Sequence, residues 1–184
     1  MTERTASRIK MATCSLAGCF GCHMSLLDID ELLLALAERI EFDRGPLTDL
    51  KHCSEHVDVG LVEGGIANAD NVEVLREFRA RCACLVAVGA CAITGGVPSL
   101  RNRFTVSECL REAYVDGLGV VKPGIPSDPE LPLLLDKLRP IHEVVRVDYV
   151  LPGCPPPAAA FRELITALLE GREPVLPREL RRFD

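Results

Sequence analysis

The stretch Ala83-Cys84-Leu85-Val86-Ala87-Val88-Gly89 decides the expected fold, because it is a nearly continuous apolar run. Such a run is typical of a central parallel strand that is buried on both faces of a sheet. Other apolar segments predict strands before and after it, at residues 8–14, near 40–42, at 57–62 and at 144–151.

The segments between these strands carry helical patterns. In residues 25–40 the apolar positions recur at helical spacing, which predicts one helix with Ser25 as its N-cap. A further helix is expected over about 70–81, capped by Asn68 or Asp70. Strands and helices therefore alternate along the chain.

This alternation predicts an α/β fold, a flavodoxin-like doubly wound parallel sheet closed by a helix over 155–171. Residues 95–140 interrupt the alternation with one expected helix near 105–114 and a stretch rich in proline and glycine. So long a connection is usually functional. We expect one domain over residues 1–184, with 95–140 as a partner-facing insertion before the last strand.

Composition excludes several classes of protein. The 184 residues are 48% hydrophobic, which excludes a disordered chain. The net charge is −6 and tryptophan is absent, so the chain lacks the basic surface and stacking residues of a nucleic-acid binder. No apolar run is long enough to span a membrane. The polar segment Met1 to Lys10 has no apolar core of a secretory signal, so we expect a cytoplasmic protein.

Nine cysteines are the unusual feature of the composition. An odd number without an export signal favours metal or redox chemistry over a disulfide framework. Four of them follow expected strands: Cys19 and Cys22 the first, Cys91 the central one and Cys154 the last. Because the carboxyl ends of parallel strands meet at one edge of the sheet, these four thiols are predicted to converge.

Four thiolates can hold either zinc or an iron–sulfur cluster. One Cys-x-x-Cys pair and two single cysteines favour a cluster over a structural zinc site, which commonly uses two such pairs. A thioredoxin-like redox pair would leave Cys91 and Cys154 unexplained. The alternative of a flavin- or zinc-binding interaction module without an electron relay stays open.

Other candidate residues have weaker contexts. Cys14 ends the first strand and is either a cluster contact or a spare thiol, and His23 is either a donor to a cluster sulfur or a solvent-facing residue. Glu63 ends a strand at the same edge of the sheet. Its role there is that of a proton carrier, an interface contact or a residue that caps a loop. The segment His52-Cys53-Ser54-Glu55-His56 is expected to be a solvated connector. The cysteines expected to be structural are Cys82, Cys84 and Cys109.

Nucleotide-binding motifs are absent from the sequence, which contains neither G-x-x-x-x-G-K-[ST] nor G-x-G-x-x-G. FMN would suit a flavodoxin-like sheet. However, the loop Ser15-Leu16-Ala17-Gly18-Cys19 lacks the serine- and threonine-rich character suited to its phosphate, and the cysteines compete for the space. FMN is therefore not the expected cofactor.

Four segments, in this order, resemble the small subunit of a [NiFe]-hydrogenase. They are Thr13-Cys14-Ser15-Leu16-Ala17-Gly18-Cys19-Phe20-Gly21-Cys22-His23-Met24-Ser25, Val62-Glu63-Gly64-Gly65-Ile66, Gly89-Ala90-Cys91-Ala92 and Leu151-Pro152-Gly153-Cys154-Pro155-Pro156. The resemblance implies a flavodoxin-like fold in which Cys19, Cys22, Cys91 and Cys154 ligate one proximal [4Fe–4S] cluster. It also implies a hydrogenase large subunit that carries the Ni–Fe centre, so this chain holds no catalytic residue and has no activity alone.

The chain departs from the longer members of that family, because it stops at Asp184 and lacks an export signal. In this it resembles the small subunit of the cytoplasmic NAD-reducing, or bidirectional, hydrogenase. That resemblance implies diaphorase subunits with FMN and further iron–sulfur clusters, which pass electrons to NAD⁺. Soluble hydrogenases that reduce NADP or F420 stay as alternatives.

A related alternative is the cluster-bearing subunit at the quinone site of respiratory complex I. That family is similar in fold and in its later cysteines. It typically carries adjacent cysteines in the first loop, whereas this chain has the spaced pair Cys19 and Cys22. The spacing favours the hydrogenase.

Overall fold

The computed structural model describes residues 8–46 and 48–182 and contains a five-stranded parallel sheet. Its spatial order is β2-β1-β3-β5-β7, the flavodoxin-like order, so the predicted fold class is confirmed. Residues 1–7, part of the polar segment used to argue against a signal, lie outside the described residues. The strands are β1 (Ile9–Ser15), β2 (Ile40–Phe42), β3 (Val57–Glu63), β5 (Cys82–Val88) and β7 (Tyr149–Leu151).

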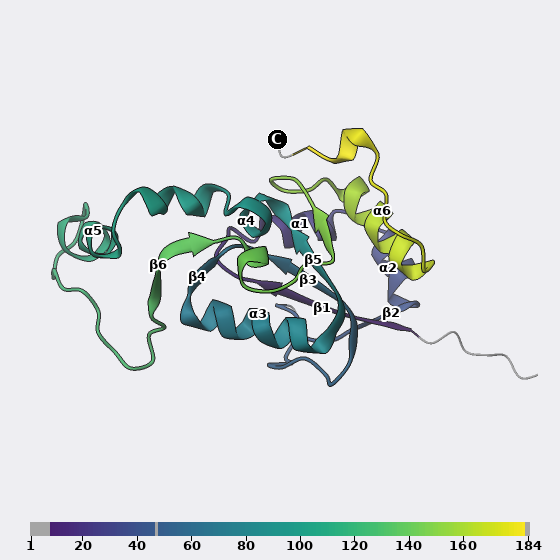
Figure 1. The fold of residues 1–184 in the computed structure, drawn as a ribbon, viewed down its shortest axis with the longest axis horizontal. Helices are drawn as coiled ribbons and strands as arrows, with labels where there is room; N and C mark the ends of the chain where they lie inside the picture. Colours follow the sequence, from purple (N-terminus) through teal and green to yellow (C-terminus); the bar gives the residue numbers. More distant parts are fainter. Residues whose placement is uncertain (1–7, 47, 183–184) are drawn as a thin grey trace, which may run out of the picture.

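Helices cover both faces of this sheet (Figure 1). On one face lies α3 (Ala69–Arg81), and on the other lie α1 (Gly21–Leu27), α2 (Leu32–Ala37) and α6 (Ala158–Leu169). The helix α3 begins where the Asn68 side chain accepts a hydrogen bond from the Asn71 amide at 2.9 Å, as the sequence predicted. Its interior then places Leu75 and Phe78 against the sheet.

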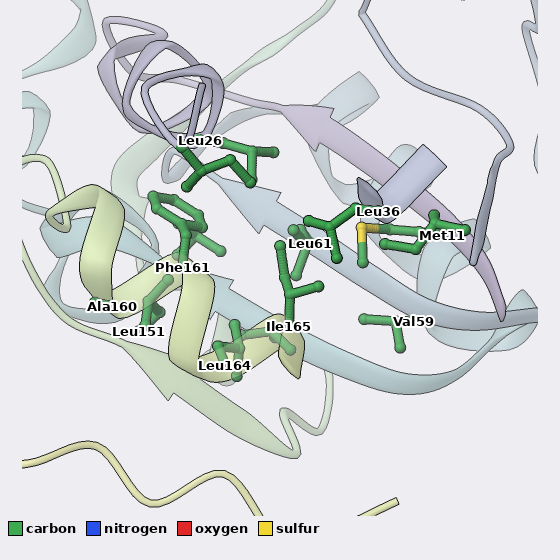
Figure 2. Close-up of a cluster of buried hydrophobic side chains, with 14 of the residues drawn as sticks. Met11, Leu26, Leu36, Val59, Leu61, Leu151, Ala160, Phe161, Leu164 and Ile165 are labelled. Atoms are coloured by element: carbon green, nitrogen blue, oxygen red, sulfur yellow. The ribbon is translucent and has the colours of Figure 1, made fainter. Parts of the chain in front are cut away.

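Alternation along the strands divides the core into two clusters, one on each face. Leu61 packs toward α1, α2 and α6, whereas its neighbour Val62 packs toward α3. Figure 2 shows the first cluster, in which Leu26 and Phe161 lie together over the sheet. This packing anchors α1, and with it the cysteines of the first loop, to the carboxyl edge of the sheet.

The prediction of one helix over 25–40 is wrong. The segment forms α1 and α2, separated at Asp30, whose φ of 52° is left-handed and interrupts the helical path. Ser25 is therefore not an N-cap, because α1 begins at Gly21 and the Ser25 hydroxyl donates to the Pro156 carbonyl at 2.6 Å. The break lets Leu26 and Leu36 both reach the core.

Residues 95–140 contain more structure than the one helix expected there. After α4 (Gly89–Thr94) comes a 3-10 segment, followed by α5 and a π-helical turn that lie at the end of the molecule away from β2 (Figure 1). The chain returns in β6, which pairs antiparallel with β4. The elements within residues 95–140 are η1 (Val97–Arg103), α5 (Val106–Arg111), η2 (Glu112–Asp116) and β6 (Leu134–Arg139). The strand that pairs with β6 is β4 (Ile66–Asn68).

The strand expected over 144–151 is shorter than predicted, since only Tyr149–Leu151 pairs with β5. Short 3-10 turns precede it at η3 (Ile141–Glu143) and follow α6 at η4 (Arg178–Leu180). Within residues 8–46 and 48–182, no helix has the length and apolar character needed to cross a membrane.

Candidate functional site

Cys19, Cys22, Cys91 and Cys154 line one cavity at the carboxyl edge of the sheet. The cavity has a volume of about 60 Å³, which is more than the volume that one water molecule occupies in liquid water. Cys19 and Cys154 are exposed, whereas Cys22 and Cys91 are half-buried. The structure thus brings together the four cysteines that the sequence singled out, and their role as ligands stays a prediction.

Three segments bring these thiols together, and each follows a parallel strand. Cys19 and Cys22 follow β1 and flank the start of α1; Cys91 lies in α4 after β5. Cys154 follows β7. The Ala90 amide donates to the Gly153 carbonyl at 2.8 Å, which joins the first turn of α4 to the segment after β7.

Glycines leave space beside the sulfur atoms. Gly89 has φ +79°, and a Cβ atom there would lie under 3.0 Å from the Cys22 sulfur. A Cβ at Gly96 would lie 3.0 Å from the Cys91 sulfur. At both positions glycine lets the backbone lie closer to a cysteine sulfur than a residue with a Cβ atom would allow.

The residues around the cavity fit an iron–sulfur cluster. Such clusters are held by four cysteine thiolates, and this cavity presents four thiols with glycine backbone beside them. In the part of the chain that the structure describes, no group of three His, Cys, Asp or Glu side chains is placed to hold a single metal ion. The set of four thiol donors is what fits such a cluster.

Burial favours the protonated form of two of these thiols. It raises the pKa of Cys22 well above its ordinary value, and Glu63 and the neighbouring cysteines raise it further. Burial and the charges of Cys154 and Cys19 also raise the pKa of Cys91. Binding of a metal group would therefore release protons from these sulfurs.

Glu63 is a carboxylate buried beside the cavity, with 2% of its surface exposed. It accepts hydrogen bonds from the Ser15 hydroxyl at 2.7 Å and the His23 amide at 3.0 Å. Burial alone would raise its pKa, but the hydrogen bonds and charge from His23 and Ser15 hold the pKa below its usual range. These contacts fix the loop after β1 to the end of β3.

His23 is buried, which rules out the solvent-facing alternative for this residue. Its ring stacks on Phe20 with the ring centres 4.7 Å apart, and Nδ1 lies 3.2 Å from the Glu63 carboxylate. Neither ring nitrogen makes an aligned hydrogen bond within the described residues. A bond from His23 to a cluster sulfur stays a prediction.

The remaining cysteines lie away from the cavity. Cys14 packs with Cys53 and Cys82 in the core on the α3 face, and it does not line the four-cysteine cavity. Cys82 is buried as expected. Cys84 and Cys109 are half-buried, on β5 and α5. No local pattern in the sequence indicates that Cys53 is buried in the same core cluster as Cys82, because the two are far apart along the chain.

The segment His52 to His56 is a connector, as predicted, but it is not solvated throughout, because Cys53 is buried in the core. His52 is mostly exposed and lies 3.3 Å from Glu77, and His56 is mostly exposed and lies 3.2 Å from Asp58. The two histidines therefore pair with different carboxylates.

Comparisons with known proteins show the family of the chain. Residues 19–168 match the family described as NADH ubiquinone oxidoreductase, 20 Kd subunit. The chain is 44% identical over 180 residues to the NAD-reducing hydrogenase HoxS subunit delta of Cupriavidus necator, an alignment that covers 96% of this chain and 86% of that protein. It is 38% identical over 175 residues to one subunit of the F420-non-reducing hydrogenase of Methanothermobacter marburgensis, covering 94% of this chain but only 57% of that protein.

A solved structure is similar over nearly the whole chain. It is a chain of an NAD⁺-reducing [NiFe]-hydrogenase in the H₂-reduced state, with 55% sequence identity and a TM-score of 0.92. The match covers 96% of this chain and 99% of that one. A [NiFeSe]-hydrogenase chain from Dm. baculatum, at 18% identity and a TM-score of 0.57, shares the fold.

Proposed function

The chain belongs to the NADH ubiquinone oxidoreductase 20 Kd subunit family and, within it, to the small subunits of NAD-reducing [NiFe]-hydrogenases, and on this premise we propose its role in detail. It is the electron-transfer subunit of a hydrogen:NAD⁺ oxidoreductase. Hydrogen is oxidised in a large subunit that carries the Ni–Fe centre. Electrons leave toward diaphorase subunits that contain FMN and iron–sulfur clusters and reduce NAD⁺, so the complex works in the cytoplasm.

The observation that carries this proposal is the single cavity lined by Cys19, Cys22, Cys91 and Cys154. In the proposal these four thiolates hold one proximal [4Fe–4S] cluster, which supplies one-electron transfer when bound. The chain itself is not a catalyst of hydrogen oxidation.

The chain's own residues position the thiolates and shield them. Leu26 and Phe161 fix α1 on the sheet, so that Cys22 is held beside Gly89. Glu63 ties the first loop to β3 through Ser15 and His23. A preformed set of thiols, of which Cys22 and Cys91 are half-buried, limits the rearrangement that a change of redox state would require.

The insertion at residues 95–140 is proposed to face a neighbouring subunit of the hydrogenase. Ten of its large apolar side chains are exposed, an unusual concentration for a surface that water alone would cover. Leu118 and Val121 are almost fully exposed. These side chains are Val97, Leu100, Phe104, Tyr114, Leu118, Val121, Ile125, Leu131, Leu133 and Leu134.

Hydrogen exchange with and without the large subunit tests this surface. The amides of residues 97–134 are expected to exchange more slowly in the complex, while those of the exposed connector at His52 keep their rate. An unchanged rate over 97–134 in the complete complex would remove the insertion from the proposed interface.

Replacement of one proposed ligand tests the function. In the complete complex, Cys91→Ser should abolish hydrogen-dependent NAD⁺ reduction, because the relay loses a ligand. Exchange of hydrogen isotopes, which needs only the large subunit's centre, should persist. The matched control is Cys84→Ser, which changes a half-buried thiol on β5 outside the cavity and the insertion and should keep both activities. Full NAD⁺ reduction in the Cys91→Ser complex would refute the proposal.

A further inference from the structure

A groove runs along one open edge of the parallel sheet. Its volume is about 520 Å³, and its lining comes mainly from β7, from the chain just before β7 and from the segment that follows α6. β7 is the last strand in the order β2-β1-β3-β5-β7, so within the described residues only β5 pairs with it. None of residues 97–134 lines the groove, which makes it separate from the surface of the insertion.

The strand at this edge can accept a further strand. An edge strand presents backbone N–H and C=O groups on its free side, and these groups can pair with another extended chain. Val150, in the middle of β7, is 53% exposed, and Val175, across the groove in the segment after α6, is 68% exposed. Apolar side chains thus stand beside an unpaired backbone edge.

Both faces of the edge contribute apolar side chains to the groove. Leu164 and Leu176 belong to the core cluster beside α6, whereas Ile93 and Val147 pack against the cluster beneath α3. Successive side chains of a strand point to opposite faces of a sheet. A strand added beside β7 would therefore place alternate apolar side chains against each of these pairs.

The unpaired charge at the groove is positive. Arg181 lines it, and Arg178 and Arg182 lie close to Arg181 in the sequence, with only Glu179 among them. None of the three arginines forms an ion pair within residues 8–46 and 48–182. The carboxylate that lines the groove, Asp148, already pairs with two other arginines. An acidic occupant would complement this charge.

We propose that the groove binds an extended, acidic segment of a neighbouring subunit, which adds to β7 as a sixth strand of the sheet. In such strand addition the main-chain hydrogen bonds supply affinity and the alternate side chains supply specificity. The segment carries apolar residues at alternate positions and an aspartate or glutamate beside Arg181. The proposal rests on the proposed function only in taking the hydrogenase complex as the assembly that contains the partner.

Photo-cross-linking in the purified complete complex tests the occupant. The photoreactive residue p-benzoylphenylalanine replaces Val175 in one sample and Leu34, which is 76% exposed on α2 and outside the groove, in the control. After irradiation and digestion, the label at Val175 should link to one acidic segment of another subunit, and the label at Leu34 should not reach that segment. Links that stay within this chain, links to a second copy of it, or no link to another subunit would overturn the proposal.

Amide exchange in the unaltered complex tests the added strand itself. A free edge strand leaves alternate amides open to water, whereas a strand paired on both sides protects all of them. We expect the three amides of β7, Tyr149–Leu151, all to exchange slowly when resolved residue by residue by mass spectrometry. Fast exchange at any of them would show that the edge is open and would overturn the proposal.

Charge reversal tests the acidic character of the segment. At a dilution where half of the Val175 link is lost, Arg181→Glu should lower the remaining yield by about two- to fivefold, the effect of one exposed ion pair. The matched control Arg162→Glu makes the same charge change at an exposed position of α6 outside the groove and should keep the yield. Equal yields in the two variants would refute the acidic assignment. Iron per chain separates this test from the proposed function, because normal iron with no link would overturn the groove assignment alone.

Discussion

Substitution of Gly89 by alanine should damage the site through a single added methyl group. Gly89 has φ +79°, a region that costs an L-residue roughly 1–2 kcal/mol. The new Cβ would also stand under 3.0 Å from the Cys22 sulfur, so the thiol must move. Such overpacking adds about 1–3 kcal/mol of destabilisation.

Gly119 provides a matched control, because its φ of +86° is nearly the same and nothing lies within 4 Å of an added Cβ. Gly119→Ala should therefore cost only the backbone strain of about 1–2 kcal/mol. In a domain of this size 1 kcal/mol shifts the melting temperature by about 2–4 °C. Gly89→Ala should melt roughly 2–12 °C below the control.

Two measurements in parallel check this reasoning, thermal unfolding by circular dichroism and iron retained per chain. Gly89→Ala should lose both stability and iron relative to Gly119→Ala, because only the former displaces Cys22. If the two variants melt together and keep the same iron, the close approach of Gly89 to the Cys22 sulfur has no part in holding the site.

Three further predictions concern the fold. Phe161→Ala should lower the free energy of unfolding, measured by urea denaturation, by about 3–5 kcal/mol, because the ring is 1% exposed in the core. A loss under about 1 kcal/mol would contradict that packing. Asn68→Ala should cost about 1 kcal/mol through the lost cap of α3, and an unchanged urea midpoint would argue against the cap. Burial alone would raise the pKa of Asp148, but hydrogen bonds from Arg79 at 2.6 Å and the Leu85 amide hold that pKa below its usual range. The stabilisation from ionised Asp148 is therefore present above the pKa of the unfolded state and is lost as the pH falls through the pKa of the folded state. The difference in free energy of unfolding between the wild type and Asp148→Asn should thus shrink in acid. A difference that stays constant with pH would count against this interaction.

The sheet was predictable because its strands carry local signals. The apolar run at β5 and the capping residue Asn68 act within a few positions, and the structure has both where the sequence predicts them. The four cysteines could be grouped because parallel topology alone sends the ends of β1, β5 and β7 to one edge.

The failures arose where tertiary contacts override local pattern. The apolar spacing of residues 25–40 is helical throughout, but the helical path breaks at Asp30 so that α1 and α2 can both pack on the core. The strand β6 has no alternation of its own, and it exists because β4 pairs with it across the fold. Cys53 and Cys82 likewise belong to one core cluster although they are far apart along the chain, which their spacing in the sequence cannot reveal.

The central claim is that four thiols from three loops hold one four-iron cluster. Iron, acid-labile sulfide and zinc should be quantified in the anaerobically purified complex, and in the same complex with Cys19, Cys22, Cys91 and Cys154 all replaced by serine. The account predicts that the replacement removes about four iron and four sulfide per chain and no zinc. Unchanged iron and sulfide, or the loss of about one zinc per chain, would contradict it.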